Sequence, residues 1–145
     1  MTDAQTSATG QTADRASHAD PAKKAMIYVV DDDTDVRSSL RFLLETEGFD
    51  VRTFRNGPAL LGSPARNSAH CLVIDYKMAE LDGVELALRL RRLDVTTPII
   101  LITGYPEPNI AAKANSAGIR KVLLKPNLEG NLADCVRKLI DLPAT

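Results

Sequence analysis

The chain reads Ala25-Met26-Ile27-Tyr28-Val29-Val30-Asp31-Asp32-Asp33 close to its start, an apolar run that ends abruptly in acidic residues. Three later apolar runs also stop at a polar group: Cys71-Leu72-Val73-Ile74 before Asp75, Pro98-Ile99-Ile100-Leu101-Ile102 before Thr103, and Lys121-Val122-Leu123-Leu124 before Lys125. Continuous apolar runs of this length are typical of strands that are buried on both faces of a parallel sheet. These stretches therefore predict a core and, along one edge of it, a row of polar groups.

Helical patterns lie between these runs. After the first run, apolar residues recur at helical spacing from Val36 to Leu44, with Asp33 or Thr34 to cap the helix and Gly48 to end it. Other helices are predicted over residues 83–93, 109–117 and 132–140, with a short one near 58–61. Residues 51–54 fit a strand nearer an edge, and residues 62–70 are predicted to be a surface loop.

Strand and helix therefore alternate five times along the chain. Short links and right-handed crossovers make this a doubly wound α/β fold with a five-stranded parallel sheet. In such sheets a site lies beyond the carboxyl ends of the strands, beside the point where the strand order reverses. That rule brings the aspartates, Thr103 and Lys125 into one place.

Size and composition favour one soluble globular domain. The 145 residues carry 44% hydrophobic and 26% charged residues with a net charge of -1, so nothing favours nucleic acid or an acidic membrane surface. No apolar run approaches the roughly 20 residues that span a bilayer. Residues 1–24 are polar, which predicts a flexible tail and not a secretory signal. Cys71 and Cys135 sit among apolar residues as expected of small core residues, and a cytoplasmic location fits.

Asp31 and Asp32 leave the first strand together, where they could serve a metal ion. A hard cation such as Mg²⁺ takes oxygen ligands and retains water, so the pair could supply one direct and one water-mediated ligand. Taken alone, such a pair is more often part of a helix cap or turn. Asp33 is predicted to take that capping role.

The other three polar residues suit phosphoryl chemistry. Asp75, beside a metal, could act as a nucleophile and form an aspartyl phosphate. The hydroxyl of Thr103 could donate to a phosphoryl oxygen, with Gly104 leaving room for it, and Lys125 could pair with Asp75 and later with the phosphoryl group. Each residue taken singly also fits a turn or a surface strand end. Their shared position at the ends of predicted strands favours a site.

The chain resembles receiver domains of two-component response regulators in five stretches. These are Val29-Val30-Asp31-Asp32-Asp33, Leu72-Val73-Ile74-Asp75-Tyr76-Lys77-Met78, Leu81-Asp82-Gly83, Ile102-Thr103-Gly104 and Leu124-Lys125-Pro126. Such receiver domains are the chemotaxis-regulator-like family, with a flavodoxin-like (βα)5 fold. The first strand and helix are especially similar to receivers of the nitrogen-fixation regulator group. The resemblance covers residues 25–142, which leaves 143–145 as a short C-terminal end.

The resemblance implies a role for each residue. Asp75 would be the phospho-acceptor, while Thr103 and Lys125 would be the partners of the phosphoryl group. Asp31, Asp32, Asp75 and the backbone carbonyl of Lys77 would bind Mg²⁺. The phosphoryl group would come from a sensor histidine kinase or a phosphotransfer protein, and the protein would be a signalling switch and not an enzyme.

Three residues depart from the family pattern. Ala79 stands where the family has proline, which is expected to loosen the loop. Val122 stands where an aromatic residue usually couples to the threonine, and Asn127 follows Lys-Pro where phenylalanine is commoner. These departures are expected to alter signal output more than phosphorylation.

The main hypothesis is a stand-alone phosphorylatable receiver without an output domain; a separated DNA-binding part is the other explanation. The downstream target is unknown, no direct binding to nucleic acid or membrane is expected, and a homodimer stays open. A pseudo-receiver scaffold without phosphate cycling is the alternative. An aspartyl-phosphate hydrolase fits less well, because Lys77 occupies the place of its general acid. A dinucleotide-binding fold lacks its Gly-rich loop.

Overall fold

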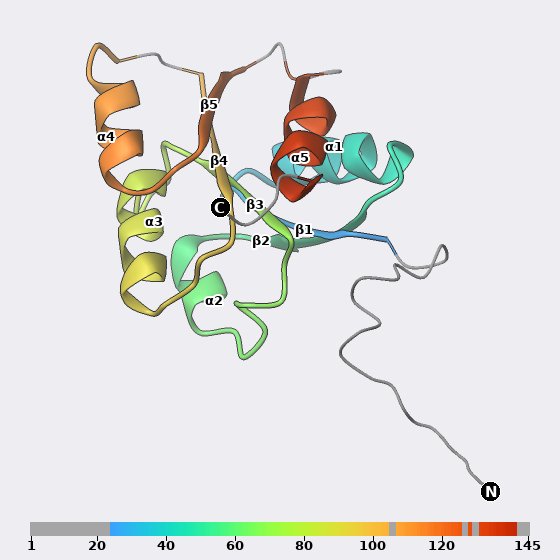
Figure 1. Ribbon diagram of the computed structural model, residues 1–145, viewed down its shortest axis with the longest axis horizontal. Helices are drawn as coiled ribbons and strands as arrows, with labels where there is room; N and C mark the ends of the chain where they lie inside the picture. The colour runs from blue at the N-terminus through green and yellow to red at the C-terminus, as the bar shows by residue number, and fades with distance from the viewer. Residues whose placement is uncertain (1–23, 105–106, 126–127, 129–130, 142–145) are drawn as a thin grey trace, which may run out of the picture.

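The computed structural model describes residues 24–104, 107–125, 128 and 131–141 (Figure 1). The predicted tail, except Lys24, and residues 126, 127 and 143–145 lie outside the described residues. The elements in chain order are β1 (Met26–Val30), α1 (Thr34–Thr46), β2 (Asp50–Phe54), α2 (Gly57–Leu61), β3 (Cys71–Asp75), α3 (Gly83–Arg92), β4 (Ile99–Thr103), α4 (Ile110–Ser116), β5 (Lys121–Leu124) and α5 (Asn131–Asp141). This alternation of strand and helix is the one that the sequence predicts.

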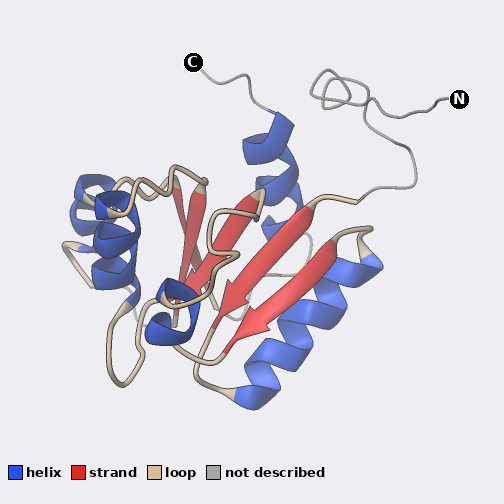
Figure 2. Ribbon diagram, turned by 90° about the horizontal axis from the view of Figure 1, so that it is seen from below, coloured by secondary structure: helices blue, strands red, loops and turns tan. Residues whose placement is uncertain are grey.

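The strands form one parallel sheet in the order β2-β1-β3-β4-β5, and the arrows in Figure 2 all run the same way. The chain reverses direction across the sheet between β1 and β3, which makes the carboxyl ends of these two strands the switch point. β2 lies at one edge, as predicted.

The prediction that the fifth strand is buried on both faces is wrong. β5 is the other edge of the sheet and pairs only with β4, so Lys121 and Leu124 are exposed. An apolar run of four residues can therefore belong to an edge strand, because the covering helices on either side bury only part of it.

Side chains alternate between two helical layers. Ile27, Val29 and Val73 face the layer made by α1 and α5, whereas Tyr28, Leu72 and their neighbours face the layer of α2, α3 and α4. Figure 1 shows α1 and α5 on one side of the sheet and the other three helices across it. The strands are apolar throughout because both faces are covered.

Local signals explain where the helices begin and end. Asp33, and not Thr34, caps α1, since its carboxylate accepts hydrogen bonds from the N–H groups of Asp35 and Val36. Gly48 follows the helix with a φ of +99°, a conformation that favours glycine. Asp82 and Glu85 form a capping box at the start of α3.

Two further expectations concern the cysteines and the membrane. Cys71 is fully buried, and Cys135 is partly buried and packs against the α1–α5 layer. Among the helices of the described residues, none is long and apolar enough to cross a membrane.

Candidate functional site

Strand alternation brings Asp31, Asp75 and Lys125 to one face of the sheet. Ile27 and Val29 are alternate residues of β1, and Asp31 is the next in that alternation, one position past the strand. Asp75 follows Cys71 and Val73 in the same way and is the last residue of β3. Lys125 likewise lies two residues after Leu123, one position past the end of β5. Because residues two apart in a strand share a face, all three side chains point toward the α1–α5 side at the carboxyl edge.

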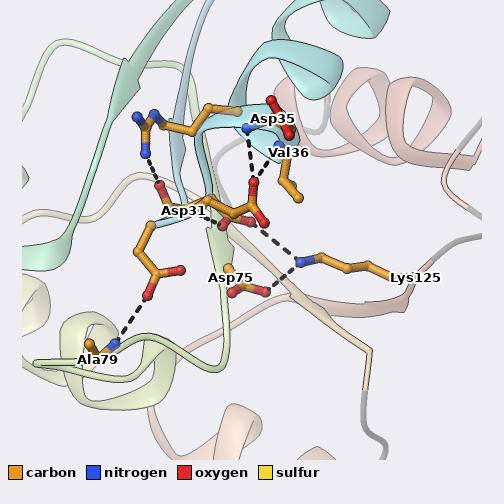
Figure 3. A network of polar contacts seen from close by, with 9 residues as sticks. Asp31, Asp35, Val36, Asp75, Ala79 and Lys125 are labelled. Carbon is orange, nitrogen blue, oxygen red and sulfur yellow. Dashed lines mark hydrogen bonds and ion pairs between the residues drawn. The ribbon is translucent and has the colours of Figure 1, made fainter.

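Lys125 joins the two buried carboxylates (Figure 3). Its Nζ lies 3.0 Å from Oδ1 of Asp75 and 3.4 Å from Oδ2 of Asp31. Asp31 is held in turn, because its Oδ1 accepts a hydrogen bond from the N–H of Asp33 and its backbone carbonyl accepts one from Arg37. The sequence prediction that these residues converge is therefore met by the geometry.

Burial dominates the electrostatics of this group. Asp75 is 7% exposed, and desolvation together with the charge of Asp31 raises its pKa from 3.8 to about 6, against the opposing effect of Lys125. Burial also raises the pKa of Asp31. The pKa of Lys125 is raised as well, because the hydrogen bonds and charges of the two aspartates outweigh its own desolvation. The carboxylates thus carry an excess of negative charge that a further cation would relieve.

Asp32 completes an oxygen-rich cluster. One oxygen each from Asp31, Asp32 and Asp75 lies within 4.8 Å of the others, although Asp32 itself is exposed. Three carboxylates beside open solvent are ligands of the kind that Mg²⁺ prefers, with positions left for water. The donor set therefore fits a hard divalent cation. The single positive charge of Lys125 does not balance the negative charge of the three carboxylates.

The backbone N–H of Ala79 donates to Oδ2 of Asp32 at 3.2 Å (Figure 3). A looser loop is predicted at Ala79, because the family that the sequence resembles has proline there. The structure instead shows a hydrogen bond that proline, which lacks an N–H, could not make. This contact joins the loop after β1 to the loop after β3.

Thr103 ends β4 and is fully buried. Its backbone carbonyl accepts a hydrogen bond from the N–H of Lys125, so the two residues are neighbours at the strand ends. A pocket lies at this edge of the sheet, and Gly104 lines it whereas Thr103 does not. A methyl group at Gly104 would occupy open space, with Cβ of Lys125 at 4.0 Å as its nearest contact.

A pocket of about 450 Å³ lies over these groups. Its walls include Asp31, Asp32, Asp33, Val36, Asp75, Lys77, Gly104 and Lys125. Gly83 allows the start of α3 to lie close to the end of β3, because a Cβ at this position would come within 2.6 Å of the backbone oxygen of Asp75. Every predicted site residue except Thr103 lines this pocket.

Sequence reasoning missed a second polar group beside the pocket. The hydroxyl of Tyr76 donates to Oε1 of Glu107 at 3.1 Å, and Nζ of Lys77 lies 3.1 Å from Oε2. Nζ of Lys113, from α4, lies 3.6 Å from Oε1. The hydrogen bonds from Lys77 and then Tyr76 lower the pKa of Glu107. Tyr76 continues the buried alternation of Leu72 and Ile74, but no sequence signal marks Glu107 as its partner.

Val122, which replaces the expected aromatic residue, packs partly buried against the α3–α4 layer. It borders a hollow of about 270 Å³ between α4 and β5, which Ala111, Ala114, Asn115, Ile119, Arg120 and Lys121 also line. Asn127, the other departure near it, lies outside the described residues.

Comparison with known proteins identifies related chains. The family described as "Response regulator receiver domain" matches residues 27–137. The transcriptional regulatory protein FixJ of Bradyrhizobium diazoefficiens is 36% identical over 117 residues, which are 81% of this chain and 57% of that protein. Nodulation protein W of the same organism is 32% identical over 84% of this chain and 54% of its own length. The chain thus spans about half the length of these curated relatives.

Solved structures agree with the observed fold. The response regulator StyR superposes with a TM-score of 0.73 at 35% identity, covering 81% of this chain and 60% of that one. The structure titled FixJ-N gives a TM-score of 0.73 at 30% identity, over 85% of this chain and 99% of that one. Chemotaxis protein CheY4 of Vibrio cholerae, at 22% identity, gives a TM-score of 0.75 over 81% of this chain and 99% of its own, which supports the fold alone.

Proposed function

Because this chain belongs to the response regulator receiver domain family, we propose that it is a phosphorylatable switch that accepts a phosphoryl group on Asp75. Receiver domains of this family are parts of two-component signalling systems and are not enzymes in the ordinary sense. The observation that carries the proposal is the ammonium of Lys125 at 3.0 Å from Asp75 and 3.4 Å from Asp31, beside three clustered carboxylates.

The proposed chemistry is transfer of a phosphoryl group to a carboxylate. An oxygen of Asp75 attacks phosphorus in line with the leaving atom of the donor; the new O–P bond forms as the bond from phosphorus to the donor breaks. Lys125 lies 3.0 Å from the Asp75 carboxylate, and the ionised form of that carboxylate is the one that attacks. The pocket over Asp75 leaves room for the incoming group.

Each neighbour has a proposed role in that step. Lys125 leaves Asp75 and pairs with an oxygen of the phosphoryl group, as a compact point charge suits phosphate. The hydroxyl of Thr103 follows the phosphoryl group, and Gly104 leaves the space for it. Asp31, Asp32, Asp75 and the carbonyl of Lys77 would hold Mg²⁺, and the bound ion would neutralise charge that develops on the transferred group.

The proposal extends to partners and output. The donor is a sensor histidine kinase or a phosphotransfer protein, in the cytoplasm, and the acyl phosphate shifts a two-state equilibrium in the loops after β4 and β5. The receiver unit spans residues 25–142. The relative FixJ is named a transcriptional regulatory protein, so we propose that the output of the switch is regulation of transcription.

The test is transfer of label from radioactive acetyl phosphate in the presence of Mg²⁺. Wild type should be labelled, and Asp75→Asn should not. Asp33→Asn is the matched control, since Asp33 lines the same pocket but only caps α1, and asparagine caps equally well. Equal labelling of Asp75→Asn would reject Asp75 as the acceptor.

Beryllofluoride with Mg²⁺ separates a switch from a scaffold. A receiver that cycles phosphate should show a changed amide NMR spectrum around β4 and β5 on treatment. An unchanged spectrum, together with no labelling, would favour the pseudo-receiver.

A further inference from the structure

The loop after β3 is held at its first residue from two sides. The carbonyl of Tyr76 accepts a hydrogen bond from the N–H of Gly83, at the start of α3. The hydroxyl of the same residue donates to Glu107, just before α4. Tyr76 is 5% exposed, so its ring is fixed by the core as well. Tyr76, between Asp75 and Lys77, is therefore bound both to the start of α3 and to the segment before α4.

Glu107 gathers three donors from two segments of the chain. Tyr76 and Lys77 reach its two carboxylate oxygens from the loop after β3, and Lys113 reaches it from α4. The ammonium of Lys77 also lies 5.3 Å from the centre of the Tyr76 ring, which favours the same arrangement. Glu107 thus clamps two consecutive residues that directly follow the proposed acceptor.

We propose that Glu107 is a positioning residue for the Asp75 site, acting through Tyr76 and Lys77. The clamp holds the backbone around Lys77, whose carbonyl would be a ligand of the cation, and it holds the loop in which the N–H of Ala79 reaches Asp32. Lys77 and Ala79 would then both serve the carboxylate cluster. This inference rests on the proposed function, because it assigns the clamp to the cation and phosphoryl site described above.

The Tyr76 hydroxyl carries most of this effect. Lys77 and Lys113 are about half exposed, and exposed ion pairs contribute little free energy. The hydrogen bond from Tyr76 is partly buried and comes from a ring that cannot move freely. By the usual strength of such a bond, its loss should weaken Mg²⁺ binding by about two- to tenfold.

The experiment measures Mg²⁺ affinity by titration calorimetry in four single variants of the full chain. Tyr76→Phe and Glu107→Ala remove the clamp, since alanine leaves no acceptor for the Tyr76 hydroxyl. Tyr28→Phe is the control for a lost tyrosine hydroxyl, since that hydroxyl donates to Ala65 at 2.8 Å, away from the pocket. Glu80→Ala is the control for a lost charge, because Glu80 is an exposed acid in the same loop.

A second readout needs no metal. Hydrogen exchange of the Ala79 amide, followed by NMR in EDTA, should speed up in Tyr76→Phe and Glu107→Ala but not in the two controls. Combining the two clamp variants should weaken Mg²⁺ binding by less than the product of their separate effects, since both break the same hydrogen bond.

The outcomes separate the clamp from the function. If wild type binds Mg²⁺ and takes up label, while Tyr76→Phe matches Tyr28→Phe in affinity and in Ala79 exchange, the clamp is rejected and the proposed function stands. A loss in Glu80→Ala as large as that in Glu107→Ala would also reject it, as a general charge effect. If wild type neither binds Mg²⁺ nor takes up label, the proposed function fails and the inference fails with it.

Discussion

Replacing Asp75 with asparagine should stabilise the metal-free protein at neutral and alkaline pH. The folded state raises the pKa of Asp75 to about 6 from an ordinary value of 3.8, because burial and the charge of Asp31 disfavour the carboxylate. The folded protein therefore binds this proton more tightly than the unfolded chain does. The stability linked to it is complete below pH 3.8 and is lost as the pH rises through about 6.

The size of the effect follows from that shift. A change of about two pKa units corresponds to about 3 kcal/mol between the protonated and ionised forms above pH 6. Asparagine carries no charge to desolvate, but it binds Lys125 less well than a carboxylate does. We therefore expect a net gain of about 1–3 kcal/mol in the free energy of unfolding at pH 8.

The assay is urea unfolding of wild type and Asp75→Asn in EDTA at several pH values between 4.5 and 8. The difference in unfolding free energy should be small at pH 4.5 and should grow until it levels off above pH 7. Asp33→Asn, which changes an exposed cap, should show no such growth. An Asp75→Asn variant no more stable than wild type at pH 8, or a difference independent of pH, would refute the reasoning.

Three other variants test separate parts of the account. Asp32→Ala should weaken Mg²⁺ binding strongly in a calorimetric titration, and an unchanged affinity would contradict its role as a ligand. Lys125→Ala should keep the far-ultraviolet circular dichroism of wild type while losing the spectral response to beryllofluoride; global unfolding would make the lysine structural. Arg91→Ala should lower the free energy of unfolding by about 2 kcal/mol, since the guanidinium donates to three backbone carbonyls, two after α3 and one at Gly118. An unchanged urea midpoint would show that these hydrogen bonds contribute nothing net.

The strands could be predicted from sequence because both faces of the sheet are covered. Such strands are apolar at every position, so their limits stand out, and β1 falls on residues 26–30 as predicted. Asp31 and Asp75 could be placed together because each directly follows such a run. β5 was the exception, since its edge position depends on strand order, which apolar runs do not encode.

Contacts between loops could not be predicted in the same way. Glu107 meets Tyr76 only because α4 begins beside the loop after β3, 31 residues away along the chain. The hydrogen bond from Ala79 to Asp32 uses a backbone N–H, which every residue but proline carries, so the side chain gives no signal. Such contacts depend on how loops of particular lengths turn, and no periodic pattern records that.

The most direct test of the central claim is a crystal structure of the protein with beryllofluoride and Mg²⁺. The account predicts a beryllofluoride group on a carboxylate oxygen of Asp75, with Lys125 against one fluorine and the cation held by Asp31 and Asp32. A group bound elsewhere, or an unmodified Asp75 still paired with Lys125 at saturating beryllofluoride, would contradict it.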